Sequence, residues 1–211
     1  MRSDYFVNHL RASKFPWSIY HRPLEVHLAR FLADVSLSSA SPGVLVVGGG
    51  FLQELPTVPQ NVRLTVVDID ERVTTYLANM NDPRLERCLT IRGPKDLTAL
   101  GPFHGIYAKE VIEHITEVEP YLAVLAKLLR PGGLLWVSTP NYGDPWLPLV
   151  EATVLELIGR MSGYSRKNMH PTRFSAARLR ALLEGVGLDG VQVVKTPFKL
   201  ALVGVGWKPA G

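Results

Sequence analysis

Three consecutive glycines, Gly48, Gly49 and Gly50, directly follow a short apolar run (44–47), and an aspartate, Asp68, ends the next apolar run of the chain. Glycine lets the backbone adopt conformations closed to other residues and approach a ligand closely. A carboxylate can accept hydrogen bonds from both hydroxyls of a ribose, which a neutral side chain does not reproduce. A glycine turn followed by an acid at this spacing therefore predicts a cofactor that carries adenosine.

The residue three positions after Gly50 separates two classes of adenosine cofactor. A dinucleotide places its pyrophosphate at a helix N-terminus within a Gly-x-Gly-x-x-Gly turn, and Gln53 stands where the last glycine of that turn belongs. S-adenosylmethionine has no phosphate groups and does not need that glycine. The sequence therefore favours S-adenosylmethionine.

A histidine and two glutamates stand where a base for such chemistry is expected. Methyl transfer from a sulfonium mainly needs alignment of the two reactants, but a hydroxyl nucleophile also needs a base that takes its proton. His114 lies just past the expected fourth strand and is the candidate catalytic residue. Glu110 and Glu113 are three residues apart and share a helical face, with Glu110 expected in the site and Glu113 structural. The six histidines are dispersed along the chain, so we expect no metal site.

Two aromatic-rich segments are expected to form the substrate side. The first is the N-terminal stretch with Trp17 and Tyr20, and the second runs from Asn141 to His170 with Tyr142 and Trp146. An apolar, aromatic segment above a sheet edge is a natural lid for a hydrophobic small molecule. The predicted substrate residues are Trp17, Tyr20, Tyr142, Trp146 and His170.

The elements that position these residues alternate along the chain. Five apolar strand-like runs alternate with amphipathic helical segments, and the chain then continues with a further helix and two last strands. Pro23 is expected to open the first helix, Thr116 to begin a capping box, and Ser175 to cap the last helix. The final two strands are joined by a turn too short for a crossover helix, so they must be antiparallel.

This alternation predicts an α/β fold: a three-layer sandwich around a Rossmann-like seven-stranded, mostly parallel sheet with a C-terminal antiparallel hairpin. We expect one domain over residues 1–211, with an N-terminal helical cap (1–40) and a lid-like insert (141–170). Ligands of such sheets lie beyond the carboxyl ends of the strands, where the glycine turn and Asp68 fall.

Composition excludes several classes of protein. The chain has 211 residues, of which 46% are hydrophobic, and a formal net charge of only +4, which excludes intrinsic disorder. Its one cysteine, Cys88, excludes a disulfide framework. We find no stretch apolar enough to span a membrane and no secretory signal, so we expect a cytoplasmic protein. The basic residues are dispersed rather than clustered, which favours a small-molecule acceptor over a nucleic-acid partner. Whether the protein forms a homodimer stays open.

Several motifs occur together in the order found in one family. They are Val-Leu-Val-Val-Gly-Gly-Gly at 44–50, Val-Val-Asp-Ile-Asp at 66–70, Ala-Lys-Glu-Val-Ile-Glu-His-Ile at 108–115, Leu-Arg-Pro-Gly-Gly at 129–133 and His-Pro-Thr-Arg-Phe-Ser at 170–175. From residue 44 to about 205 the chain resembles the class I S-adenosylmethionine-dependent methyltransferases, in their type 11 and ubiquinone-biosynthesis-like small-molecule branch. The resemblance implies methylation of a small molecule, in the first place at oxygen. It also implies that the cofactor is bound by Gly48, Gly49, Gly50, Asp68, Ile69, Asp96, Lys109 and Glu110.

The chain departs from that family at four positions. Val46 stands where an acid is usual, Leu52 where a third glycine is usual, and His104 where the fourth strand normally has aspartate. Asp96 can hold the adenine amino group only with a shift of two residues. Three alternatives therefore stay open: a non-catalytic module of the same fold, an NAD(P)-dependent oxidoreductase, and an RNA methyltransferase.

Overall fold

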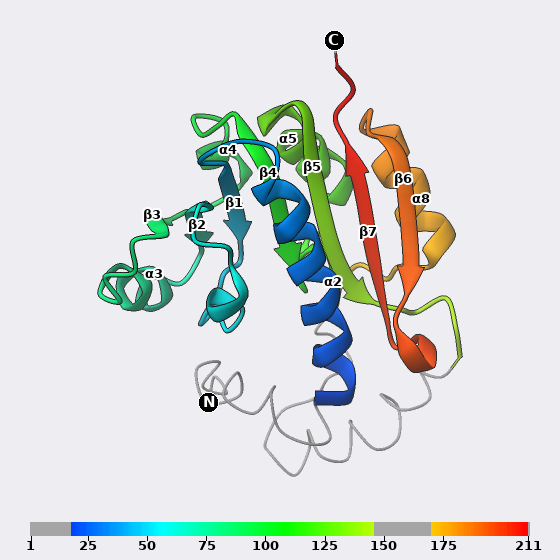
Figure 1. Cartoon of the computed structure of the whole chain (residues 1–211). Coiled ribbons are helices and arrows are strands. Elements are labelled where there is room, and N and C mark those ends of the chain that lie inside the picture. The colour runs from blue at the N-terminus through cyan, green and yellow to red at the C-terminus, as the bar shows by residue number, and fades with distance from the viewer. Residues whose placement is uncertain (1–17, 146–169, 211) are drawn as a thin grey trace.

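The computed structural model describes residues 18–145 and 170–210, which build one seven-stranded sheet with helices on both faces (Figure 1). The strands are β1 (Gly43–Val47), β2 (Arg63–Asp68), β3 (Leu85–Thr90), β4 (Phe103–Lys109), β5 (Leu129–Pro140), β6 (Asp189–Lys195) and β7 (Ala201–Trp207). The helices of this part of the chain are α2 (Ser18–Ser36), α3 (Glu71–Ala78), α4 (Pro94–Leu97), α5 (Val118–Leu128) and α8 (Ala176–Gly185). Short 3-10 turns are η1 (Leu55–Thr57), η2 (Ile112–His114) and η4 (Pro197–Lys199).

The order of the strands across the sheet is β3-β2-β1-β4-β5-β7-β6. Neighbouring strands from β3 to β5 are parallel, and β7 runs antiparallel to both β5 and β6. Only residues 196–200 join β6 to β7, and so short a connection permits an antiparallel pair alone. The predicted sheet, mostly parallel with a C-terminal antiparallel hairpin, is confirmed.

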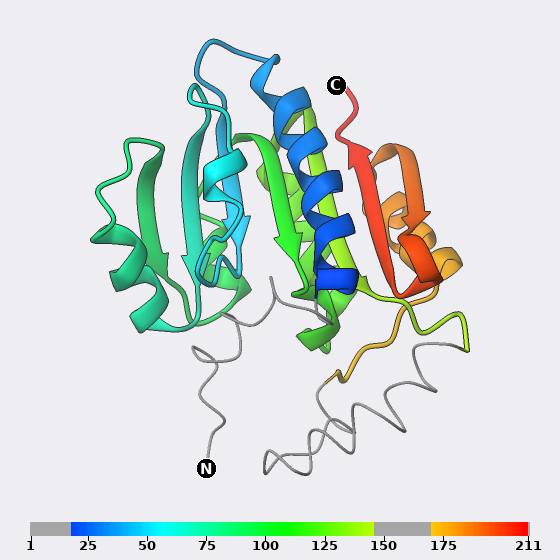
Figure 2. The same ribbon diagram turned by 60° about the horizontal axis from the view of Figure 1, so that its bottom comes forward.

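The two faces of the sheet are covered by different helices, as the two ribbon views show (Figures 1 and 2). Helices α2 and α3 pack on one face, and α4, α5 and α8 pack on the other. Side chains alternate along a strand, so in β1 Leu45 and Val47 enter one apolar cluster while Val44 and Val46 enter the other. Both faces of β1 are therefore buried, which explains why its sequence is an uninterrupted apolar run.

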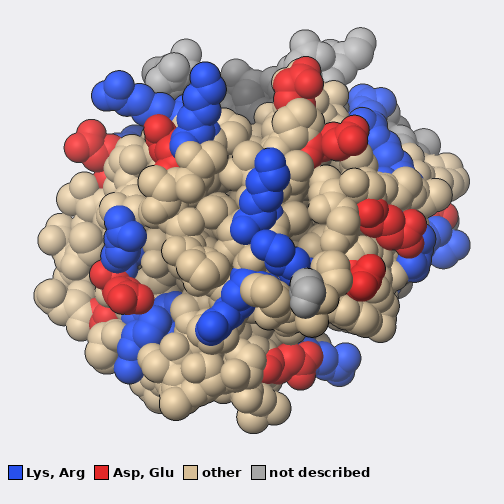
Figure 3. Space-filling view, turned by 90° about the horizontal axis from the view of Figure 1, so that it is seen from above, with Lys and Arg blue, Asp and Glu red and all other residues tan. Residues whose placement is uncertain are grey.

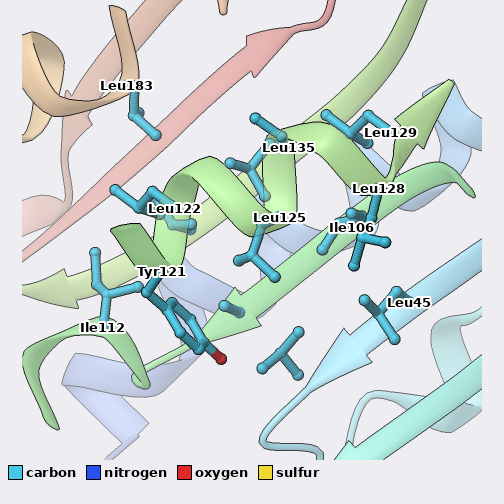
Figure 4. Close-up of a cluster of buried hydrophobic side chains, with 14 of the residues drawn as sticks. Leu45, Ile106, Ile112, Tyr121, Leu122, Leu125, Leu128, Leu129, Leu135 and Leu183 are labelled. Atoms are coloured by element: carbon cyan, nitrogen blue, oxygen red, sulfur yellow. The ribbon is translucent and has the colours of Figure 1, made fainter. Parts of the chain in front are cut away.

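Leucines of α5 form much of the larger core. Leu122, Leu125 and Leu128 point from α5 toward the sheet, where they meet Ile106 and Leu45 (Figure 4). All five side chains are at most 6% exposed. This packing holds β1 and β4 side by side, and with them the loops that leave their carboxyl ends.

The expected helix boundaries are partly wrong. Ser175 does cap α8, because its hydroxyl oxygen accepts the backbone N–H of Arg178 at 3.2 Å. The N-cap of α5 is Glu117 without a side-chain hydrogen bond, so the expected capping box at Thr116 does not form. Helix α2 begins at Ser18 and contains Pro23, which therefore does not open it. The extra turn matters, because it carries Tyr20.

The loops of the predicted site share one edge of the sheet. Strands β1, β4 and β5 point downward in Figure 1, and β2 is parallel to β1, so the carboxyl ends of all four meet at the lower edge. The part of the proposed lid at 146–169 lies outside the described residues, and the lid stays a prediction. Among the described helices, none has the combination of length and apolar composition needed to cross a membrane.

Candidate functional site at the carboxyl edge of the sheet

The glycine turn after β1 requires glycine at two positions. Gly48 and Gly50 have φ angles of 66° and 49°, in the left-handed region that side chains disfavour. A Cβ atom on Gly48 would also lie 2.6 Å from Cγ2 of Val111. The turn is therefore a stretch of backbone without side chains, and Val111 fills the space beside Gly48.

Asp68 lies beside this turn and holds it in place. Its carboxylate accepts the backbone N–H of Gly50 at 3.2 Å and that of Asp70 at 2.9 Å, and the residue is only 6% exposed. A carboxylate has about four lone-pair sites, so two backbone contacts leave capacity for ribose hydroxyls. The next residue, Ile69, is 79% exposed and offers an apolar surface at the same edge.

The other residue predicted for the adenine end, Asp96, lies in α4, after β3. It is exposed, and its carboxylate accepts the backbone N–H of Arg92 at 2.7 Å. That hydrogen bond shapes the loop between β3 and α4. A contact of Asp96 with adenine stays a prediction.

The position where the resembled family has its third glycine keeps the backbone shape of a glycine. Leu52 has a φ of 48° and is 2% exposed, so a bulky side chain is buried on a left-handed backbone. Such a conformation costs roughly 1–2 kcal/mol for a residue with a Cβ. Leu52 thus has a backbone conformation that favours glycine, although its side chain is large and buried.

A buried ion pair joins the loop after β1 to the end of β4. Glu54 is 4% exposed, and its carboxylate accepts hydrogen bonds from the Lys109 ammonium and, at 3.0 Å, from the Tyr107 hydroxyl. The Lys109 side chain keeps 23% of its surface exposed, so it still meets solvent on its other side. The sequence pointed to Lys109 but not to Glu54, because these partners are far apart along the chain.

Glu110 lies at the centre of a second polar network. The Tyr20 hydroxyl of α2 donates to Oε2 of Glu110, and the Ser138 hydroxyl donates to Oε1 at 3.0 Å. Glu110 also has a left-handed φ of 58°. Burial raises its pKa to about 7, although the hydrogen bonds from Tyr20 and Ser138 act in the opposite direction. Tyr20, predicted on the substrate side, thus contacts a residue predicted on the cofactor side.

The pKa of Glu110 makes stability depend on pH. The folded protein holds a proton on Glu110 that the unfolded chain releases near pH 4.5, so the free energy of unfolding should fall as pH rises from there to about 7. Glu110→Gln should flatten this decline by an amount on the order of 2–3 kcal/mol. Urea unfolding at pH 5, 6, 7 and 8 measures it, with the exposed Glu86→Gln as the control. If the free energy of unfolding depends on pH in the same way in wild type and Glu110→Gln, the raised pKa of Glu110 is contradicted.

Glu113, His114 and His170 come together at the same edge. One ligand-type atom from each lies within 4.8 Å of those of the other two, and the two imidazole rings are 5.1 Å apart. Glu113 is 1% exposed, and its Oε2 has no hydrogen-bond partner among the described residues. Burial and the nearby charge of Glu110 raise the pKa of Glu113. Two imidazoles and a carboxylate can shuttle protons, and they are also a donor set that divalent transition metals accept.

Sequence spacing did not predict this cluster, because His170 comes from a distant segment. That segment is fixed by Thr172, whose N–H donates to the carbonyl of Glu113 at 3.2 Å and whose hydroxyl donates to the carbonyl of Ile115 at 2.6 Å. The Tyr142 hydroxyl lies 2.6 Å from Nδ1 of His170. Three predicted site residues, His114, Tyr142 and His170, are therefore neighbours.

Two predicted substrate residues cannot be compared with the structure. Trp17 and Trp146 lie outside the described ranges 18–145 and 170–210. Tyr20, Tyr142 and His170 are described, and all three lie at the edge that carries the glycine turn.

Comparison with known proteins places this arrangement in a family context. A family model described as a methyltransferase domain matches residues 27–193. The ubiquinone biosynthesis O-methyltransferase of Caulobacter vibrioides is 32% identical over 124 residues, which are 56% of this chain and 49% of that protein. The chain spans about half the length of the curated relatives it matches.

Solved structures show the same fold at low sequence identity. A possible exported protein from Bordetella parapertussis has a TM-score of 0.70 at 19% identity, covering 90% of this chain and 68% of that one. Magnesium protoporphyrin IX methyltransferase from Synechocystis, solved with bound SAH, has a TM-score of 0.65 at 17% identity, covering 98% of this chain and 95% of that one.

Proposed function

Because the chain belongs to the methyltransferase-domain family, we propose that it transfers the methyl group of S-adenosylmethionine to an oxygen atom of a small molecule. The observation that carries the proposal is the hydrogen bond from Gly50 to Asp68, which joins the glycine turn and the acid at one edge of the sheet. His114, Tyr142 and His170 lie at that same edge. Cofactor and acceptor residues are thus on the same side of the molecule.

The residues at the edge fit the cofactor along its length. Glycine at positions 48 and 50 allows the left-handed backbone of the turn, Asp68 would accept the ribose hydroxyls, and exposed Ile69 would lie against the adenine. Asp96 accepts the adenine amino group. Lys109 pairs with the carboxylate of the amino-acid end, and Glu110 lines the pocket beside it.

When bound, S-adenosylmethionine supplies an electrophilic methyl group on a sulfonium. The protein aligns the acceptor between Tyr20, Tyr142 and His170 and keeps water out of the line of attack. His114 takes the proton of the acceptor hydroxyl and becomes an imidazolium, with the ring of His170 5.1 Å away.

The first experiment is calorimetric titration with S-adenosylmethionine, S-adenosylhomocysteine and NADH, followed by a screen of small molecules that carry a hydroxyl group. Micromolar binding of the first two ligands alone, with turnover of an acceptor, supports the proposal. Binding without turnover of any acceptor favours the non-catalytic alternative. Binding of structured RNA with strong salt dependence would favour an RNA substrate instead.

Lys109 provides a test of the amino-acid end of the cofactor. Lys109→Met should lower the affinity for S-adenosylmethionine at least about tenfold, because a charge-assisted hydrogen bond is lost. Affinity for 5′-methylthioadenosine, which lacks the amino acid, should not change. Calorimetry with both ligands measures the two affinities.

The control for Lys109→Met is a variant that leaves no buried charge behind. Glu54→Gln/Lys109→Met removes both members of the pair, so Glu54 is not left as an unpaired buried carboxylate. It should show the same selective loss for S-adenosylmethionine. Equal loss of both ligands, or of neither, would rule out recognition of the carboxylate by Lys109.

We also propose a cytoplasmic location and a homodimer. The single cysteine, Cys88, is in keeping with a reducing compartment.

The homodimer is proposed from the edge of the sheet. Strand β6 is that edge, and the exposed side chains of Val194 and Trp207 lie on β6 and β7. An edge strand with exposed apolar residues is a place where a second copy can pair. Sedimentation equilibrium and cell fractionation test the two statements.

A further inference from the structure

A polar cavity lies at the opposite edge of the sheet, away from the glycine turn. It has a volume of about 310 Å³ and is lined by Ser38, Ser39, His104, Arg130, Pro131, Gly132 and Gly133. Figure 3 views this edge of the molecule, and Lys and Arg side chains lie across the middle of the face. No carboxylate is among the residues that line the cavity.

The hydrogen bonds of His104 determine which of its ring nitrogens carries a proton. The backbone N–H of Gly43 donates to Nδ1 at 3.1 Å, so Nδ1 must be an acceptor. Burial and the neighbouring charge of Arg130 lower the pKa of His104, so the ring is neutral at neutral pH. A neutral ring whose Nδ1 accepts has its proton on Nε2.

Arg130 approaches that same nitrogen. Nη1 of Arg130 lies against Nε2 of His104, and a guanidinium has donors only. Two N–H donors therefore face each other with no acceptor between them. In the described part of the chain Arg130 has no carboxylate within ion-pair distance. The pair lacks a negatively charged partner that could accept from both groups.

We propose that this cavity binds a phosphate group, held by the Arg130 guanidinium and the Nε2–H of His104. Ser39 can add a third donor, because its hydroxyl oxygen accepts from Ser41 and its own proton is left to donate. Donors from three different elements suit the tetrahedral oxygens of phosphate, and a guanidinium binds phosphate with two parallel hydrogen bonds. The cavity has room for more than a bare ion, so we take a small phosphate monoester as its proposed ligand.

A lysine ammonium adds positive charge near the cavity, and bare backbone forms part of its wall. The Lys208 ammonium donates to the carbonyls of Lys127 at 3.2 Å and Leu129 at 2.7 Å, which holds a further cation close to Arg130. A Cβ atom on Gly133 would lie 2.8 Å from the carbonyl oxygen of Arg130, so the wall here is bare backbone. The site lies apart from the carboxyl edge and does not depend on the proposed methyl transfer.

One substitution would give both the Gly43 N–H and the Arg130 guanidinium an acceptor without a ligand. His104→Asp places a carboxylate where the ring now lies, so it can accept from Gly43 and pair with Arg130. This variant should melt at a higher temperature than wild type in phosphate-free buffer and should lose phosphate binding. Arg130→Met should lose binding as well, without the gain in melting temperature. The exposed Arg87→Met is the matched control and should bind as wild type does.

The test is a titration of wild type and the three variants with inorganic phosphate and with glycerol 3-phosphate at constant ionic strength. Isothermal calorimetry measures affinity, and thermal unfolding measures stability. We expect saturable binding by wild type and Arg87→Met, weakened at least about tenfold in His104→Asp and Arg130→Met. Tighter binding of glycerol 3-phosphate than of inorganic phosphate supports a monoester ligand, and equal binding overturns that choice of ligand. Absence of saturable binding, or equal binding by all variants, overturns the site.

Discussion

Asp68→Ala should weaken the binding of S-adenosylmethionine by at least about tenfold. The carboxylate is expected to accept the ribose hydroxyls, and a hydrogen bond to a charged group contributes roughly 1.5–3 kcal/mol. The structure adds a second cause, since loss of Asp68 leaves the N–H groups of Gly50 and Asp70 without this acceptor. The bare backbone of the glycine turn would then lose the contact that fixes it beside the cofactor. Calorimetry gives the affinity.

Asp70→Ala is the control for that experiment. Asp70 caps α3 by accepting from the backbone N–H of Arg72 at 3.0 Å, and it pairs with the Arg72 side chain. Its loss should lower the free energy of unfolding by about 1 kcal/mol and leave cofactor affinity unchanged. If Asp68→Ala folds, as judged by circular dichroism, and binds as tightly as wild type, Asp68 is not the ribose acceptor.

His114→Ala should lower kcat by roughly 10²–10⁴-fold with the acceptor found in the screen, while cofactor affinity stays the same. General base catalysis by a positioned side chain contributes this much. The residue is exposed at the edge of the site, where its ring lies 5.1 Å from that of His170, so removing it should not disturb the core. Single-turnover kinetics over a range of pH separates the chemical step from product release.

Two further measurements decide what His114 does. If it is the base, a more acidic acceptor should be less sensitive to His114→Ala than a weakly acidic one, because its proton needs less help to leave. Treatment with a chelator tests the alternative that His114, Glu113 and His170 hold a metal ion. If turnover is lost on chelation and restored by a divalent cation, His114 is a metal ligand and not the base. Unchanged kcat in His114→Ala would eliminate both.

The fold could be predicted because its signals are local. The run at 44–47 is apolar on both faces, and the short link between the last two strands allows only an antiparallel pair. Helix boundaries could not be predicted as well, because helix propensity does not show which backbone groups make hydrogen bonds to distant parts of the chain. Pro23 reads as a helix start, yet α2 begins at Ser18.

The edge of the sheet at which the candidate site residues lie could be predicted, but their contacts with one another could not. Asp68 and the glycines lie in contiguous motifs, so their shared edge follows from the parallel sheet. The pairing of Glu54 with Lys109 depends on how a loop folds over the sheet, and the meeting of His114 with His170 depends on Thr172. No spacing rule expresses contacts between such distant segments.

The left-handed backbones of Leu52 and Glu110 have a consequence for engineering. Each costs roughly 1–2 kcal/mol relative to an ordinary conformation, and both lie next to the turn that is proposed to hold the cofactor. Glycine at position 52 would relieve the backbone but would remove a buried leucine side chain, which costs roughly 2–5 kcal/mol, so it would destabilise the fold. Engineering for heat resistance should therefore leave both positions unchanged and should screen for ligand binding at every round.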